Sequence, residues 1–115
     1  MIHKGSCHCG KVACEADCEI GEVVSCNCSI CRRKGHLLLF VPLDKFKLTT
    51  PRDDLSDYSF GPQRIHHHFC RACGCSPFAL GSDPKGNEMA AINVRCLEDV
   101  DLDALTIRHF DGRSL

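Results

Sequence analysis

The stretch Cys70-Arg71-Ala72-Cys73-Gly74 places two cysteines three positions apart, directly before a glycine. A second pair, Cys7-His8-Cys9-Gly10, lies near the start of the chain. Thiolates this close in sequence can converge on one soft cation, for which zinc is the usual candidate. Two such pairs supply four ligands, which is enough to close a tetrahedral site. A metal that ties segments about sixty residues apart also removes much chain entropy from the unfolded state.

A third group, Cys26-Asn27-Cys28-Ser29-Ile30-Cys31, lies between the two pairs. It supplies three ligands and leaves a fourth position open, and an open zinc site can bind or activate another molecule. The cysteines therefore predict one structural zinc and one reactive zinc. One alternative is a second structural zinc closed by a histidine or by Cys75. Another is that the paired cysteines form a redox dithiol.

The chain contains 11 cysteines. An odd number and the Cys-x-Cys spacing both argue against a disulfide framework. We expect the four cysteines outside the three groups to be small buried apolar residues. They are Cys14, Cys18, Cys75 and Cys96.

Length and charge narrow the class of protein. A chain of 115 residues suits one domain, which we expect to span residues 1–115. The net charge is −1, and no basic run exceeds Arg32-Arg33-Lys34, so nucleic acid is not an expected partner. The longest apolar run, Leu37 to Val41, is far too short to cross a membrane. The N-terminus lacks the apolar centre of a signal peptide, and we expect a cytoplasmic protein whose thiols stay reduced.

The hydrophobic pattern predicts a mainly β fold of short antiparallel strands. Most of the candidate strands alternate loosely, and the segment 36–41 is continuously apolar and ends at Pro42. Helix signals are limited to single turns at residues 29–33 and 100–105. The expected strands span residues 11–16, 36–41, 46–49, 55–60, 65–69, 89–94 and 106–110.

Three ordered motifs resemble those of a known family. They are Gly5-Ser6-Cys7-His8-Cys9-Gly10-Lys11-Val12, Cys26-Asn27-Cys28-Ser29-Ile30-Cys31-Arg32-Arg33 and Phe69-Cys70-Arg71-Ala72-Cys73-Gly74, and Ile92-Asn93-Val94-Arg95 fits as well. Together they look like the glutathione-dependent formaldehyde-activating enzyme (GFA) family, whose domain is also that of centromere protein V-like proteins. The resemblance covers nearly the whole chain.

The resemblance implies a small zinc-bound β-tent fold with two zinc ions per chain. By similarity, Cys7, Cys9, Cys70 and Cys73 hold the structural zinc. Cys26, Cys28 and Cys31 hold the second zinc, whose open position takes a substrate thiol. The implied activity is that of a carbon–sulfur lyase, which condenses glutathione with formaldehyde to S-hydroxymethylglutathione and catalyses the reverse reaction.

The open site creates a need for cations and for a proton donor. A zinc ion with four thiolates carries a net charge of −2, and Arg32 and Arg33 follow the triplet directly. Arg95 is a further candidate for binding a small-molecule thiol, possibly glutathione, and Arg71 is a weaker one. The candidate proton donors are His36 and the run 66–68. Those three histidines alternate in direction on a strand, so they cannot all face one metal. The other functional class is a non-catalytic zinc module that binds a protein or a small molecule.

Overall fold

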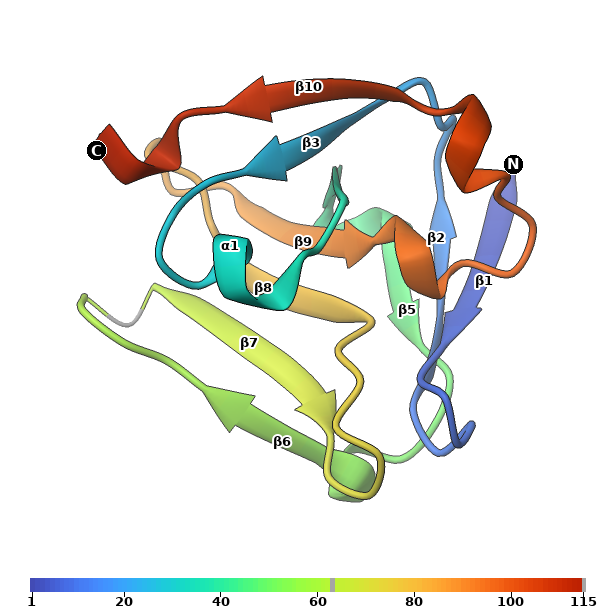
Figure 1. The fold of residues 1–115 in the computed structure, drawn as a ribbon. Coiled ribbons are helices and arrows are strands. Elements are labelled where there is room, and N and C mark those ends of the chain that lie inside the picture. The colour runs from blue at the N-terminus through green and yellow to red at the C-terminus, as the bar shows by residue number, and fades with distance from the viewer. Residues whose placement is uncertain (63, 115) are drawn as a thin grey trace.

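A computed structural model describes residues 1–62 and 64–114, and its strands form two sheets (Figure 1). The smaller sheet has three antiparallel strands in the order β1-β2-β5. These strands are β1 (Ile2–Ser6), β2 (Ala13–Asp17) and β5 (Phe46–Leu48).

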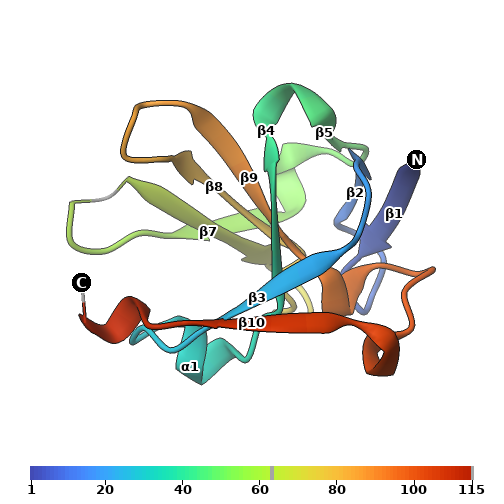
Figure 2. The same cartoon turned by 90° about the horizontal axis from the view of Figure 1, so that it is seen from above.

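The larger sheet has seven strands in the order β10-β3-β4-β9-β8-β7-β6. Neighbouring strands in this sheet run antiparallel, except that β10 and β3 run parallel. In Figure 2, β3 and β10 lie side by side, and β7, β8 and β9 diverge from them. The strands are β3 (Glu22–Cys26), β4 (Leu38–Pro42), β6 (Leu55–Tyr58), β7 (Ile65–Cys70), β8 (Phe78–Ser82), β9 (Glu88–Asn93) and β10 (Thr106–Phe110).

Helices are short in the described residues. The α-helix α1 (Cys31–Lys34) has one turn and ends at Gly35, whose φ of 71° suits a residue without a side chain. The 3₁₀ turns are η1 (Leu43–Lys45), η2 (Arg52–Asp54), η3 (Val94–Cys96), η4 (Leu102–Ala104) and η5 (Gly112–Ser114). No helix of residues 1–62 and 64–114 has the length and apolar character that a membrane crossing requires.

The hydrophobic core lies between the two sheets. Cys14 and Ala16 of β2 are buried, because alternate residues of a strand project from the same face. The rings of Phe46 in the small sheet and Phe78 in the large sheet lie 4.6 Å apart. Val12, Val23, Val41, Cys70, Ala90, Ile92 and Val94 complete the centre of this cluster.

The prediction of a mainly β fold with short strands is confirmed, and each expected strand overlaps an observed one. The pairing is antiparallel as expected except between β10 and β3, because a strand's own residues do not reveal which neighbour it will join. The sequence pattern also missed β1, β3 and β8. In β1 the buried positions are His3 and Gly5, which give no apolar alternation.

Candidate metal centres

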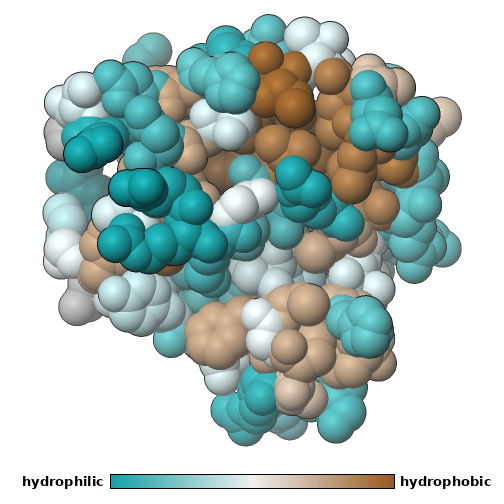
Figure 3. All heavy atoms as spheres, in the orientation of Figure 1, coloured by the Kyte–Doolittle hydropathy of each residue, from teal (hydrophilic) through white to brown (hydrophobic). Residues whose placement is uncertain are grey.

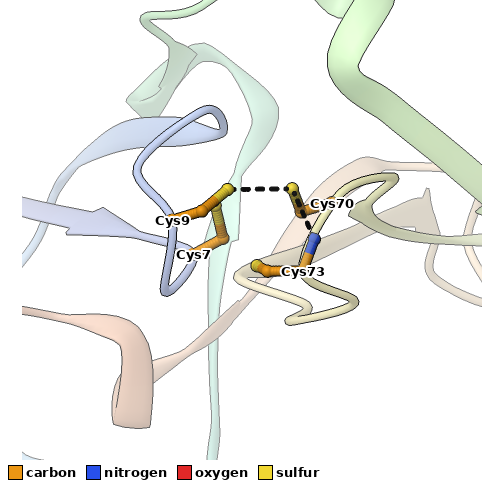
Figure 4. A group of neighbouring side chains, drawn as sticks. All are labelled: Cys7, Cys9, Cys70 and Cys73. Carbon is orange, nitrogen blue, oxygen red and sulfur yellow. Dashed lines mark hydrogen bonds between the residues drawn. The ribbon is translucent and has the colours of Figure 1, made fainter.

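The first cluster joins the two cysteine pairs. One sulfur from each of Cys7, Cys9, Cys70 and Cys73 lies within 4.8 Å of the other three (Figure 4). The Sγ atoms of Cys7 and Cys9 are 3.7 Å apart, and those of Cys9 and Cys70 are 3.6 Å apart. Zinc–sulfur bonds of about 2.3 Å in a tetrahedron require sulfurs about 3.8 Å apart. These two separations therefore match a four-thiolate zinc site.

Two tight loops shape this cluster. Cys7 and Cys9 follow β1, and the loop closes where the Cys7 amide donates to the carbonyl of Val12 at 2.9 Å. Cys70 ends β7, and Gly74 donates to the carbonyl of Cys70 at 2.9 Å with a φ of 80°. A residue with a Cβ would be strained at that φ, so the glycine allows the turn.

Backbone amides point at the sulfurs of both loops. The amides of Ala72 and Cys73 each lie 3.4 Å from the Cys70 sulfur, and the amide of Val12 lies 3.4 Å from the Cys7 sulfur. A backbone hydrogen bond from Cys73 leads the contributions that lower the pKa of Cys70. Backbone hydrogen bonds from Cys75 and then Cys9 lower the pKa of Cys73 to about 5. These bonds favour thiolates, which are the form that binds a metal.

The negative charge of the four clustered thiolates still requires a cation. A backbone hydrogen bond from Lys11 favours the Cys9 thiolate, but burial and the neighbouring sulfurs of Cys70 and Cys7 outweigh it. The pKa of Cys9 is therefore raised to about 11. Four ionised thiols this close repel one another strongly, and a divalent cation relieves that repulsion. The donor set thus fits a structural zinc.

The triplet forms the second cluster. Cys26 ends β3, Cys28 lies in the following loop, and Cys31 begins α1. One sulfur from each lies within 4.8 Å of the other two, and all three residues are half-buried. No other histidine, cysteine, aspartate or glutamate among residues 1–62 and 64–114 joins this group, and Cys75 is not part of it. The described chain therefore offers three ligands here, which disfavours a closed site.

The thiols of the triplet differ in their acidity. Burial disfavours the Cys28 thiolate, but hydrogen bonds from the backbone and thiol of Cys31 and from Cys26 outweigh burial and lower the pKa of Cys28. Burial, followed by the neighbouring sulfur of Cys28, raises the pKa of Cys31 well above its ordinary value. The three sulfurs lie close enough together to bind one cation, so this cluster also fits a metal.

The C-terminal segment lies directly on the triplet. A Cβ placed on Gly112 would be 2.5 Å from the Cys26 sulfur and 3.2 Å from the Cys28 Cβ, so only glycine allows this approach. The side chain of Asn27 links the two segments. Its amide donates to Asp111 at 3.0 Å, and its oxygen accepts from the Arg113 amide at 2.8 Å.

A cationic cleft of about 370 Å³ opens beside Cys28. Arg32, Arg33 and Arg113 contribute three positive charges to its lining, and Phe60 contributes an aromatic wall. Figure 3 shows strongly hydrophilic surface gathered over α1 on the left of the molecule. The remaining lining residues of this cationic cleft are Asn27, Cys28, Ser29 and Gly112.

Two arginines named from the sequence have other positions. Arg95 donates from Nε to the carbonyl of Gly35 at 3.1 Å and caps α1, and it is not among the residues that line the cationic cleft. Arg71 is exposed on the loop of the four-cysteine cluster. The structure therefore brings Arg32 and Arg33 to the triplet but does not bring Arg95 into the same cleft.

The candidate proton donors divide between the two faces of β7. His66 is exposed and bonds to Asp57 at 2.9 Å, whereas His68 is buried on the same face. His67 lies on the other face, with its ring 5.7 Å from that of Phe60. Burial, followed by the charge of Lys34, lowers the pKa of His36 to about 4. Burial also leads the lowering of the pKa of His67.

Sequence reasoning missed Gly112, Arg113 and Phe60 as parts of this site. Gly112 and Arg113 reach the triplet because β10 pairs in parallel with β3, which brings Phe110 opposite Cys26. That pairing spans most of the chain, and no local motif encodes it. A glycine two residues after the end of β10 was the only signal in the sequence.

The sequence model of the glutathione-dependent formaldehyde-activating enzyme family matches residues 2–109. The chain belongs to this family. The GFA match ends just before Gly112 and Arg113. Among solved structures, the chain is similar to the crystal structure of a Rhodobacter sphaeroides protein, with 30% sequence identity and a TM-score of 0.78. The match covers 91% of this chain and 99% of the other.

Proposed function

We propose that this GFA-family protein is a zinc-dependent carbon–sulfur lyase that forms and cleaves a thiol–aldehyde adduct. The observation that carries the proposal is the triplet Cys26, Cys28 and Cys31, which offers three sulfurs beside a cationic cleft. Glutathione and formaldehyde are the reactants that the family description suggests. Residues 1–115 would act as one zinc-binding domain. A reducing compartment such as the cytoplasm suits the reaction, because thiols stay reduced there.

The two clusters would have different tasks. Cys7, Cys9, Cys70 and Cys73 would hold a structural zinc that joins the loop after β1 to the end of β7. The triplet would hold the second zinc. A zinc ion bound there supplies Lewis acidity and lowers the pKa of an added thiol.

The arginines of the cationic cleft would bind the substrate thiol. Glutathione carries two carboxylates, and guanidinium groups bind carboxylates through paired hydrogen bonds. Arg32 and Arg33 follow Cys31 on α1, and Arg113 approaches from the C-terminal segment. Their charges would also offset the negative charge of the assembled thiolates.

The neutral histidines limit how protons move. His36, with a pKa of about 4, carries no proton to donate from an imidazolium at neutral pH. A proton released by the substrate thiol would then return to the oxygen of the adduct.

The test is a thiol titration of the cobalt-substituted protein. The visible spectrum of cobalt reports its ligands, so glutathione should change the spectrum of the triplet. Replacing Arg32 and Arg33 with alanine should weaken glutathione binding more than binding of the neutral 2-mercaptoethanol. Turnover with formaldehyde should exceed the uncatalysed condensation. A spectrum unmoved by any thiol, with no rate above background, would favour the non-catalytic zinc module.

A further inference from the structure

The larger sheet has one face that the core does not cover. Ala90 and Ile92 of β9 are fully buried against the core, whereas their neighbours Met89 and Ala91 project from the opposite face. A sheet face turned to solvent normally carries polar residues. Here Phe40 is 50% exposed, Ile65 is 47% exposed and Phe110 is 40% exposed. This open face is therefore unusually apolar.

The strand register places these residues on one face. Paired residues of neighbouring strands project to the same side of a sheet. Phe40 pairs with Ala91, Ala91 pairs with Ala79, and Met89 pairs with Gly81. Gly81 in turn pairs with Ile65.

A cavity of about 360 Å³ lies over this face. We call it the apolar trough, and small residues in its lining leave room between larger ones. This volume falls within the range of small-molecule sites, which are mostly apolar. Its principal lining residues are Phe40, Ile65, Ala79, Met89, Ala91 and Phe110.

Phe110 connects the apolar trough to the triplet. In the parallel pair β10–β3, Phe110 lies opposite Cys26, so both side chains project from the open face. A Cβ on Gly112 would lie 3.6 Å from the Phe110 ring and 2.5 Å from the Cys26 sulfur. One aromatic ring thus borders both the trough and the metal ligand. The cationic cleft also lies at this end, because Gly112 lines it.

We propose that the apolar trough binds the hydrocarbon chain of an aldehyde, so that the substrates include aldehydes larger than formaldehyde. This inference rests on the proposed lyase function. The cationic cleft binds the anionic thiol, and Phe110, which lines the trough, lies beside Gly112 of that cleft. An aldehyde with its chain in the trough directs its carbonyl carbon towards the triplet. Formaldehyde has no chain and gains nothing from the trough.

The reaction balances without a further reactant. The thiol sulfur bonds to the carbonyl carbon, and the carbon–oxygen π bond breaks. The proton lost by the thiol ends on the former carbonyl oxygen, which gives a hydroxyl group. Cleavage is the reverse, and nothing is oxidised or reduced.

Two measurements test the proposal. The first is calorimetric titration of the zinc-loaded protein with unreactive alcohols from propan-1-ol to hexan-1-ol. Each buried methylene should tighten binding by a factor of about four. The second is the ratio of kcat/KM for hexanal to that for formaldehyde, with glutathione as the thiol. Ala91→Leu fills the trough and should reduce hexan-1-ol binding, and the ratio of kcat/KM for hexanal to that for formaldehyde, at least tenfold. Ala79→Leu serves as a second filling variant if Ala91→Leu does not fold.

Ala104→Leu is the matched control, because Ala104 is exposed in η4 and is absent from the trough lining. It should change neither measurement. Formaldehyde turnover with no gain for longer aldehydes would overturn the trough assignment and leave the lyase function intact. Chain-length-dependent alcohol binding without turnover of any aldehyde would overturn the lyase function and with it the substrate assignment. A dimer in sedimentation analysis that binds no alcohol would show that a second copy covers the trough, and would overturn the proposal.

Discussion

Replacing one cysteine in each cluster should have unequal effects on stability. The four-cysteine cluster joins Cys9 to Cys70 across 61 positions of the chain. In the chain-entropy treatment, a cross-link that closes a loop of this length contributes about 4 kcal/mol. A structural zinc contributes at least that order, because its binding free energy is also folding free energy. We therefore expect Cys73→Ser to lower the free energy of unfolding by about 4 kcal/mol or more.

The triplet closes only a local loop between Cys26 and Cys31. Its metal adds little long-range constraint, so Cys28→Ser should lose one metal ion and remain folded. For a domain of this size, about 4 kcal/mol corresponds to a fall in Tm of roughly 10–25 °C. Thermal melts paired with elemental analysis of the same samples measure both quantities. Equal losses of Tm in the two variants would refute the division into structural and reactive clusters.

Further expectations concern metal content, the C-terminal segment and pH. Protein purified without chelator should contain two zinc ions per chain by elemental analysis, and a value near zero in reduced protein would exclude the zinc sites. Gly112→Ala should displace the Cys26 sulfur, because its new Cβ would lie 2.5 Å away, and should release the triplet metal while the fold persists; Gly21→Ala, where a Cβ meets no atom, is the control. Folding lowers the pKa of His36 from about 6.5 to about 4, so the folded state favours the neutral ring. The resulting contribution to the free energy of unfolding is complete above pH 6.5 and is lost as the pH falls towards 4. Denaturant melts should show the free energy of unfolding falling over that window in wild type, and a smaller fall in His36→Gln; equal slopes would contradict this assignment.

The sequence predicted the local parts of the site and not the distant ones. The triplet was predictable because its ligands lie within six consecutive residues, which no fold can separate widely. The two cysteine pairs were predictable because each supplies half of a tetrahedron. Arg113 was not predictable, since it reaches the site only through the β10–β3 pairing. β1 was not predictable because one of its buried positions is a glycine, Gly5, which adds nothing to an apolar pattern. Tertiary structure requires that glycine, since a Cβ there would lie 2.9 Å from the carbonyl oxygen of Cys96.

The different spans of the two clusters have a consequence for how the chain matures. During synthesis, the triplet is complete once Cys31 has emerged, and a metal there closes a loop of very low entropic cost. The four-cysteine cluster cannot form until Cys73 has been made, and it must then bring together segments that are distant in the unfolded chain. On the proposed assignment, the triplet would therefore bind its metal ion before the rest of the domain has been made. On the proposed zinc assignment, completion of the fold would wait for the second ion.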